Sequence, residues 1–213
     1  MVIDGTNSKE GIGTILTGKV SAGKIDISKG NVKVDILGYG DAIFQGEVKS
    51  IGSYRDNEFQ EAVAGMEVGL AIKSDLKRKD FRRGMVVAAR GTCTVNDHFS
   101  AELVVFPKDQ SNRATGFKRG FKPVFCFGAT MVTGELLNFS HLSDVEKIIS
   151  KKFKDKKGNE TEEKLVMPGD TISIEVKLDK PIVVLDKERF VVREGRSTIA
   201  AGRVTQVGEK KNK

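Results

Sequence analysis

Apolar and polar residues alternate along most of this chain, and clusters of Gly, Asn, Asp and Lys separate the alternating segments. A period near two, with enrichment in Val, Ile, Phe and Thr, predicts β-strands, and strand spacings of about 8–15 residues are typical of antiparallel sandwiches or barrels. The segments with this pattern are residues 14–20, 31–37, 42–51, 67–73, 85–90, 99–106, 123–127, 131–137, 171–178, 189–193 and 198–207. We therefore predict an all-β protein, and so many strands over this length indicate two compact antiparallel domains.

One segment, residues 138–164, departs from this pattern. Ser143 is followed by Glu146 three residues later, which is the capping-box spacing at a helix start. Apolar residues then recur every three or four positions, as on one face of an amphipathic helix, at Leu142, Val145, Ile149 and Phe153. The rest is almost wholly charged, so we expect a short helix and then a mobile, solvated loop. The insertion is either a surface decoration or a contact arm for RNA or a partner.

The boundary between the two domains is predicted around residues 90–92. Before it, Arg82, Arg83 and Gly84 lead into the last strand of the first set, and after it a polar turn begins the second set. This divides the chain into a first domain at 1–90, a second at 91–208 that contains the insertion, and a disordered tail at 209–213.

The charge balance permits a polyanionic partner. Lys and Arg total 36 against 29 Asp and Glu, which gives a net charge of +7. No segment approaches the ~18–20 apolar residues of a membrane-spanning helix, and the first residues have no apolar signal core. Cys93 and Cys126 lie in separate strand-like segments without metal-binding spacing, which favours a reducing compartment.

The sequence has no enzyme signature. Residues 13–20 read GTILTGKV and match the GxxxxGK of a phosphate-binding loop, but Val20 stands where a Ser or Thr must bind magnesium. This segment also consists mainly of β-branched and apolar residues, whereas a phosphate-binding loop connects a strand to the start of a helix. His98 and His141 lie in unrelated contexts, and neither GxSxG nor the guanine-reading NKxD occurs. We expect no catalytic residue, metal ligand or cofactor in this chain.

Basic residues cluster in three places, two of them beside phenylalanines. The clusters are Lys77, Arg78, Lys79, Arg82 and Arg83 around Phe81; Arg113, Lys118, Arg119 and Lys122 around Phe117 and Phe121; and Arg193, Arg196 and Arg203. Cationic side chains beside aromatic rings on a β surface fit contact with phosphates and stacking of bases. Any single cluster is better explained as an ordinary solvated surface, but three of them on an all-β scaffold shift the balance modestly toward RNA.

Several segments resemble the second and third domains of elongation factor Tu and its relatives. Residues 11–20 (GIGTILTGKV) are similar to the family's GRGTVVTGRV, residues 64–70 (AGMEVGL) to AGDNVGL, and residues 81–87 (FRRGMVV) to ERGQVL. In the second half, residues 118–127 (KRGFKPVFCF) resemble FKGYRPQFYF. VTG at 132–134, VMPGD at 166–170 and RFVVREGRSTIAAG at 189–202 then follow in the family's order. An insertion near residues 138–164 is similar to the elongation factor 1-alpha branch.

The resemblance implies two β-barrels that hold aminoacyl-tRNA, without the GTP-binding domain. It places Arg83 near the tRNA 5′ phosphate, Thr14, Ile15 and Thr17 beside the terminal adenosine pocket, and Arg55 among the tRNA-binding residues. It also places Lys122, Arg193, Glu194 and Gly195 on the surface that faces the T-stem. These residue types suit the contacts, since Arg binds phosphate and an apolar side chain covers a base.

Four positions depart from the family pattern. Gly52 replaces the glutamate expected near the terminal ribose, and Glu67 replaces the pocket asparagine. In the second half, Ala114 and Gly116 replace the His and Pro of RHTP. These changes leave the expected fold intact and are expected to weaken or redirect binding of the aminoacyl end.

Two functions remain open. The first is the tRNA-binding barrel half of a divergent translation factor, which with a GTPase domain would deliver aminoacyl-tRNA to the ribosome. The second is a GTPase-less paralogue that acts as an RNA- or protein-interaction module. For the first, the expected partners are aminoacyl-tRNA or other RNA, the ribosome, and a GTPase domain in cis or a guanine-nucleotide exchange factor. GTP and magnesium would belong to the missing domain. The expected compartment is the cytoplasm or an organelle matrix.

Overall fold

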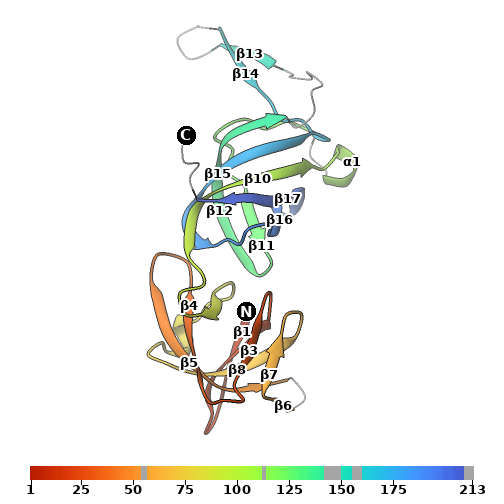
Figure 1. The fold of residues 1–213 in the computed structure, drawn as a ribbon. Helices are drawn as coiled ribbons and strands as arrows, with labels where there is room; N and C mark the ends of the chain where they lie inside the picture. The colour runs from red at the N-terminus through yellow and green to blue at the C-terminus, as the bar shows by residue number, and fades with distance from the viewer. Residues whose placement is uncertain (54–56, 112–113, 142–149, 155–159, 209–213) are drawn as a thin grey trace. The chain divides into compact units, whose positions relative to one another are not determined.

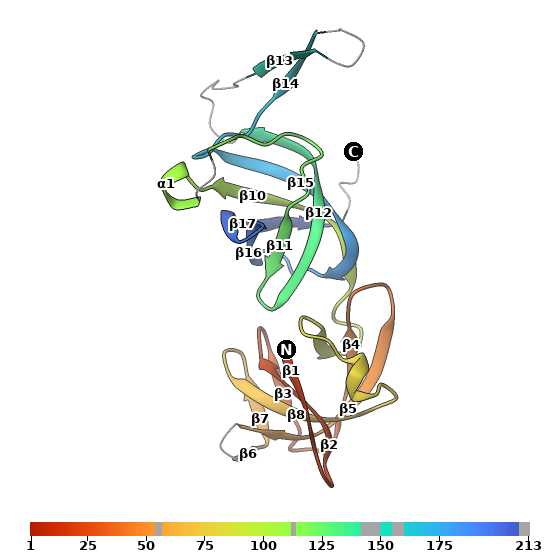
Figure 2. The same ribbon diagram turned by 180° about the vertical axis from the view of Figure 1, so that it is seen from behind.

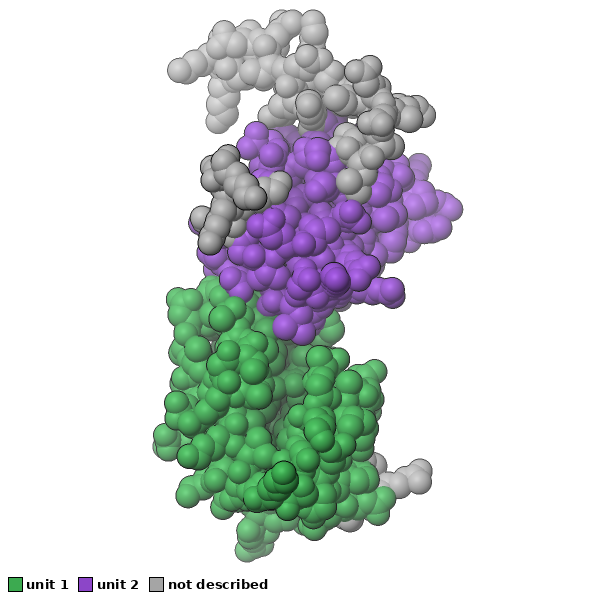
Figure 3. Space-filling view, in the orientation of Figure 1, with its two compact units in different colours: residues 1–95, 128–130, 181–183 green, residues 96–127, 131–180, 184–213 purple. Residues whose placement is uncertain are grey.

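The computed structural model describes residues 1–53, 57–111, 114–141, 150–154 and 160–208, and these residues form an almost entirely β protein (Figure 1). Each of the eleven strands predicted from alternation coincides with an observed strand. The chain divides into two compact units, which Figure 3 shows in two colours. Unit 1 comprises residues 1–95, 128–130 and 181–183, and unit 2 comprises residues 96–127, 131–180 and 184–213.

Unit 1 is a ring of antiparallel strands. Its elements are β1 (Val2–Lys9), β2 (Gly13–Lys19), β3 (Lys24–Asp26), β4 (Val32–Leu37), β5 (Ile43–Gly52), β6 (Glu58–Phe59), β7 (Glu61–Val63), β8 (Glu67–Ser74), η1 (Arg78–Asp80) and β9 (Val86–Ala89). The strands follow the order β4-β9-β1-β2-β8-β5-β6, and pairing of β4 with β5 closes the ring. Alternate residues point inward, so Leu16, Ile36 and Leu70 are fully buried in its core.

Strand β1 is the main element of unit 1 that alternation did not predict. Its sequence, VIDGTNSK, contains one strongly apolar position that is fully buried, Ile3. Pairing with β2 along its whole length forms the strand instead. A tertiary partner therefore overrides the weak local preference of Gly, Asn and Asp for strands.

Unit 2 is a closed six-stranded barrel, as the opposite views of Figures 1 and 2 show. Its elements are β10 (Val95–Val105), α1 (Lys108–Ser111), β11 (Val124–Phe127), β12 (Thr130–His141), β13 (Ser150–Lys154), β14 (Glu160–Lys164), β15 (Thr171–Val183), β16 (Arg189–Glu194) and β17 (Ser197–Val207). The barrel order is β10-β15-β12-β11-β16-β17. Phe99, Phe125, Phe127 and Phe190 fill its interior, with ring centroids 5.1–5.8 Å apart for the pairs in contact.

The predicted helical insertion is wrong where the structure describes it. Residues 142–149, the first part of the predicted helix, lie outside the described residues. Ser150–Lys154 and Glu160–Lys164, predicted as helix end and loop, form the antiparallel pair β13 and β14. The register sets Lys151 opposite Glu163 and Lys152 opposite Glu162. Pairing with a second strand therefore determines this segment, and the helical periodicity of Val145, Ile149 and Phe153 did not reveal it.

The described part of the chain contains no helix long and apolar enough to cross a membrane. Within those same residues, no group of three or more His, Cys, Asp or Glu side chains is placed to hold a metal ion. The predicted tail at 209–213 lies outside the described residues.

Candidate nucleic-acid interface

A row of small residues crosses the outer face of unit 1. Strand pairing aligns Gly5, Thr17, Gly69, Gly52 and Glu58 on β1, β2, β8, β5 and β6. Their chain neighbours Leu16, Leu70 and Ile51 are fully buried, so the row itself faces outward. The adjacent glycines, Gly69 and Gly52, leave the middle of the row without side chains. The outer face is therefore hollowed at this point.

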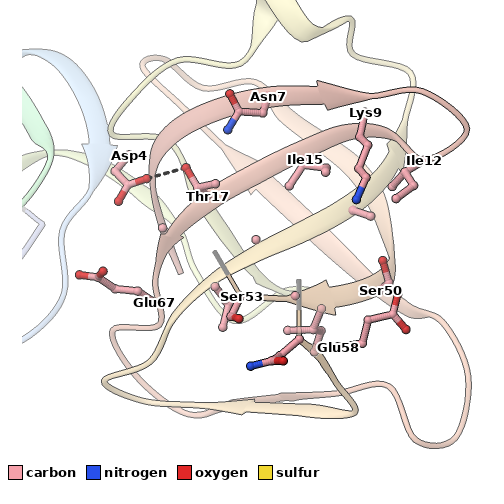
Figure 4. Close-up of a pocket in the computed structure, with 17 residues that line it drawn as sticks. Asp4, Asn7, Lys9, Ile12, Ile15, Thr17, Ser50, Ser53, Glu58 and Glu67 are labelled. Atoms are coloured by element: carbon pink, nitrogen blue, oxygen red, sulfur yellow. Dashed lines mark hydrogen bonds between the residues drawn. The ribbon is translucent and has the colours of Figure 1, made fainter. Parts of the chain in front are cut away.

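A cavity of about 520 Å³ opens over these two glycines (Figure 4). Ile15, on β2, lines it beside Gly69, where a Cβ atom would lie 3.1 Å from Ile15 Cγ2. Among the described residues, a Cβ atom at Gly52 would meet the carbonyl oxygen of Asn57 at 3.6 Å, which is an ordinary contact distance. The floor of the cavity is thus backbone at Gly52 and Gly69, with the apolar side chain of Ile15 on one side.

The charged groups around this cavity are distributed unevenly. Figure 4 shows Asp4 and Glu67 on one side and Lys9 with Ile12 on the opposite side. The hydroxyl of Thr17 donates a hydrogen bond of 2.8 Å to Asp4 Oδ1, which holds that carboxylate at the edge of the cavity. The cavity therefore has an acidic side and a side that carries a lysine.

Gly18 explains the false phosphate-loop motif. Residues 13–19 form strand β2 rather than a loop, and a Cβ atom at Gly18 would collide with the carbonyl oxygen of Val2 on β1. The glycine that precedes Lys19 is required because the backbones of β1 and β2 approach closely there. The segment is therefore a strand and not a loop that opens a helix, as its β-branched and apolar residues predicted.

The structure brings together several of the predicted adenosine-pocket residues. Ile15 and Thr17 line the cavity together with Gly52 and Glu67, the two positions that depart from the family pattern. Thr14, on the same strand, lies outside the lining that the described residues form. Arg55 lies outside the described residues.

Arg83 stands apart from this cavity. It is exposed in the turn that follows η1, and its carbonyl oxygen accepts a hydrogen bond of 3.1 Å from the Tyr39 hydroxyl. Gly84, the next residue, has a φ of 91°, a left-handed conformation that favours glycine. This backbone geometry holds the turn and leaves the guanidinium of Arg83 at the surface.

The predicted residues of unit 2 gather at one end of two paired strands. The start of β11 meets the end of β16, because Val124 pairs with Arg193. Lys122 lies two residues before β11, while Glu194 ends β16 and Gly195, with a φ of 57°, forms the tight turn into β17. The structure therefore places Lys122, Arg193, Glu194 and Gly195 at the same end of the barrel.

Two contacts orient the cations at this end. Lys122 Nζ lies 3.0 Å from Glu135 Oε2 on β12, and this hydrogen-bonded pair raises the pKa of Lys122 above its ordinary value. Arg193 Nη2 donates to the carbonyl oxygen of Arg196 across the turn, at 3.2 Å. Arg193 Nε is buried and has no hydrogen-bond partner within the described part of the chain. Burial raises the pKa of the nearby Cys126 thiol, and the positive charge of Arg193 opposes this rise.

A second cavity at the β16–β17 turn contains residues that sequence reasoning missed. It has a volume of about 410 Å³ and is lined by Arg196, Ser197 and Thr198 with Gln110 and Ser111 of α1. Hydroxyl, amide and guanidinium groups are the side chains that bind phosphate oxygens. The basic clusters had indicated Arg196, but Gln110 is 86 residues away in sequence and no local pattern connects the two.

The predicted aromatic stacking surface is wrong. Phe81 and Phe117 are 5% and 6% exposed, so their faces are not available to bases. Phe121 is half-buried and stacks on Phe117, with centroids 4.9 Å apart. Phe81 packs in the hydrophobic core of unit 1, and Phe117 and Phe121 pack on each other, while Arg82, Arg83 and Lys118 beside them in sequence are exposed. Arg113 of the same cluster lies outside the described residues.

Comparison with known families identifies the second half of the chain. A family model described as "Elongation factor Tu C-terminal domain" matches residues 92–208, which is more than half of the 213 residues. The matched region contains all six strands of the closed barrel and the end of the barrel where Lys122 and Arg193 lie.

Proposed function

The chain belongs to the elongation factor Tu C-terminal domain family, as its sequence motifs predicted, and on this premise we propose that it is the tRNA-binding part of a translation elongation factor. Both units would bind one aminoacyl-tRNA. Unit 1 would take the aminoacylated terminus, and the β11–β16 end of unit 2 would contact the T-stem backbone.

The observation that carries this proposal is the cavity in unit 1. Sequence resemblance selected Ile15, Thr17, Gly52 and Glu67 from three separate strands as positions around a terminal-adenosine pocket. All four line one cavity. Its glycine floor and the apolar side chain of Ile15 suit the flat face of a base, which a more crowded sheet surface would exclude.

The cations of unit 2 support the second contact. Arg193 and Arg196 lie at the same turn as Ser197 and Thr198, and Lys122 lies at the neighbouring strand end. Guanidinium, ammonium and hydroxyl groups of these kinds donate hydrogen bonds to the phosphate oxygens of an RNA backbone.

In this proposal the chain acts by binding and not by catalysis. GTP and magnesium would be held by a GTPase domain, joined in cis or present as a separate partner. A guanine-nucleotide exchange factor and the ribosome would be the further partners of the assembled factor.

Gly52 and Glu67 favour a second candidate function, a GTPase-less interaction module that binds RNA or protein without reading the aminoacyl end. The glutamate expected at position 52 is missing, and a carboxylate is added two positions before Gly69 on the adjacent strand. The two functions differ in one measurable property. The first requires tighter binding of aminoacylated than of deacylated tRNA, and the second does not.

The test is binding of labelled tRNA, aminoacylated or deacylated, to the 213-residue chain between about 50 and 200 mM salt. We expect affinity to fall as salt rises and to be higher for the aminoacylated form. Arg193→Ala should weaken binding and reduce the slope of log K against log salt by about 1, the effect of losing one phosphate contact. Arg83→Ala should likewise weaken binding to every tRNA.

Arg189→Ala is the matched control, because Arg189 is an exposed arginine at the other end of the same strand and opposite Arg203. Arg189→Ala lowers the net charge by the same amount as Arg193→Ala, but it should leave the slope of log K against log salt almost unchanged. Salt-independent binding would contradict the phosphate contacts, and equal affinity for both tRNA forms would favour the second candidate function.

A further inference from the structure

The hairpin of β4 and β5, orange in Figure 1, extends beyond β8, which is the other long strand that pairs with β5. Strand β4 pairs with β5 up to its first residue, Ile43. Strand β8 pairs with β5 only from Gly46 onward, where Gly46 faces Ser74. Among the described residues, the first part of β5, residues 43–45, therefore has a strand neighbour on the β4 side and none on the β8 side.

A cavity of about 300 Å³ opens along this end of β5. Its lining consists of Ile43, Phe44 and Gln45 on β5 and of Asp75 and Leu76, which follow β8. The backbone N–H of Leu76 donates a hydrogen bond of 3.2 Å to Ser74 Oγ, so the chain turns directly after β8 ends. The cavity thus lies where the next residues of β8 would have paired with β5.

Two large apolar side chains are exposed at this cavity. Ile43 is 53% and Phe44 is 37% exposed, and apolar side chains that are grouped on a surface mark interaction sites. Leu76 is partly buried and packs against the core of unit 1, so the part of the lining that it forms is fixed. In the loop of the same hairpin, the Tyr39 hydroxyl donates a hydrogen bond to the Arg83 carbonyl oxygen. A site held in this way loses little conformational freedom when a partner covers it.

The charges at this cavity favour a basic partner. Asp75 is the charged residue of the lining, and the exposed Asp41 lies in the hairpin loop two residues before Ile43. The neighbouring Arg90 directs its guanidinium to Gln45 Oε1, at 2.8 Å. The phosphates of an RNA would be repelled by Asp75 and Asp41, whereas lysine or arginine side chains would be attracted. Exposed apolar residues beside carboxylates therefore suit a basic protein segment and not a nucleic acid.

We propose that this end of β5 docks an extended protein segment that carries one large apolar side chain between Lys or Arg residues. The apolar side chain fills the cavity between Phe44 and Leu76, and the basic residues lie toward Asp75 and Asp41. The backbone of the segment takes the position that β8 leaves, as in recognition by strand addition. This inference goes beyond the proposed function, because the residues that line this cavity belong to neither of the tRNA-binding surfaces described above.

The experiment uses the full 213-residue chain and three pentapeptides with blocked ends. The peptide KVFVK has the proposed chemistry, EVFVE reverses its charge, and KVSVK removes its large apolar side chain. Binding is measured by NMR titration, which also identifies the amide groups that the peptide perturbs. We expect KVFVK to perturb residues 43–45 and 75–76 and to bind about tenfold more tightly than either of the other peptides.

Two variants test the residues of the cavity. Phe44→Ala should weaken binding of KVFVK about tenfold, as expected for an aromatic side chain at the centre of a contact. Asp75→Asn should weaken it about two- to fivefold, the effect of one exposed charge pair. The matched controls are Val63→Ala, at an apolar residue of β7 that is 42% exposed, and Asp186→Asn, at an exposed carboxylate of unit 2. Both residues lie outside the lining, so these controls should bind KVFVK as the unchanged chain does.

Several outcomes would overturn this inference. Equal affinities for the three peptides, or equal effects of Phe44→Ala and Val63→Ala, would show that the cavity does not select this chemistry. If labelled tRNA perturbs residues 43–45 and KVFVK does not, the surface binds RNA instead. If KVFVK does not bind and the chain sediments as a dimer that Phe44→Ala dissociates, the surface belongs to a second copy of the chain. Phe44→Ala should bind tRNA as the unchanged chain does, so this inference and the proposed function can fail separately.

Discussion

Gly18 has no side chain, and the carbonyl oxygen of Val2 occupies the place where one would begin. Gly18→Ala should therefore push β1 away from β2 and lower the free energy of unfolding by about 1–3 kcal/mol, the usual cost of overpacking. Gly52→Ala is the matched control on β5, because among the described residues its Cβ would make one ordinary contact, at 3.6 Å from the Asn57 carbonyl oxygen. Denaturant unfolding followed by circular dichroism measures both variants. Equal stability of the two would show that β1 and β2 do not require the glycine.

Glu188 is a carboxylate that the fold holds in an unfavourable environment. Burial raises its pKa above the ordinary value of 4.5, although the backbone N–H of Leu185 donates a hydrogen bond of 2.9 Å to it and acts in the opposite direction. A raised pKa means that folding favours the protonated form. This contribution to stability is complete below pH 4.5 and is lost as pH rises through the folded-state pKa.

Glu188→Gln should for this reason raise the melting temperature at about pH 7 and lose its advantage toward about pH 4, since the amide oxygen still accepts from Leu185. The measurement is the difference in Tm between the two proteins across that range. A pH-independent difference, or a less stable Gln variant at neutral pH, would contradict this account.

The strands of the unit 2 barrel are joined in its interior by aromatic contacts. Phe99 on β10 meets Phe125, Phe127 and Phe190 edge-on, with centroids 5.5–5.7 Å apart, and thereby links β10 to β11 and β16. Phe99→Ala should cost about 3–5 kcal/mol of unfolding free energy, because it leaves a cavity among three rings. Phe44→Ala on β5, where the ring is 37% exposed, is the control and should cost much less. Chemical denaturation of both variants compares them, and a similar loss in each would argue against a central role of Phe99.

Alternation was sufficient to predict the strands whose two faces differ most in burial. Strand β15 is an example, since Ile172, Ile174 and Val176 are buried and the residues between them are not. Strands β1, β13 and β14 were missed because partner strands, and not their own composition, determine them. In the insertion, apolar residues at helical spacing predicted a helix, but the structure has a strand at Ser150–Lys154.

Resemblance to the family predicted individual residues of the candidate site, but it did not predict the surface that these residues form together. Ile15 and Thr17 were found from a motif, but the row that joins Thr17 to Gly69, Gly52 and Glu58 depends on the register of four strands. The register is set by pairing between strands, so it cannot be deduced from the sequence of any one strand. For the same reason, Asp4, Lys9 and Gln110 carried no signal in the sequence.

The whole molecule is basic, with a net charge of +7 and a pI near 9.3. Solubility should fall as pH approaches that value, because mutual repulsion between molecules disappears when the net charge reaches zero. Light scattering of the chain between about pH 7 and pH 10 measures this. Constant scattering across the pH range would mean that charge does not keep the molecules apart.

The glycine floor of the unit 1 cavity limits how specifically the cavity can recognise a ligand. The peptide groups of Gly52 and Gly69 lie in paired strands, so their hydrogen-bonding capacity is directed along the sheet and toward neighbouring strands. Such a floor accepts any flat ring of suitable size and cannot distinguish one base edge from another. In the function proposed above, recognition of a particular nucleobase must therefore come from the polar side chains at the rim, and changes there would alter base preference without altering the sheet.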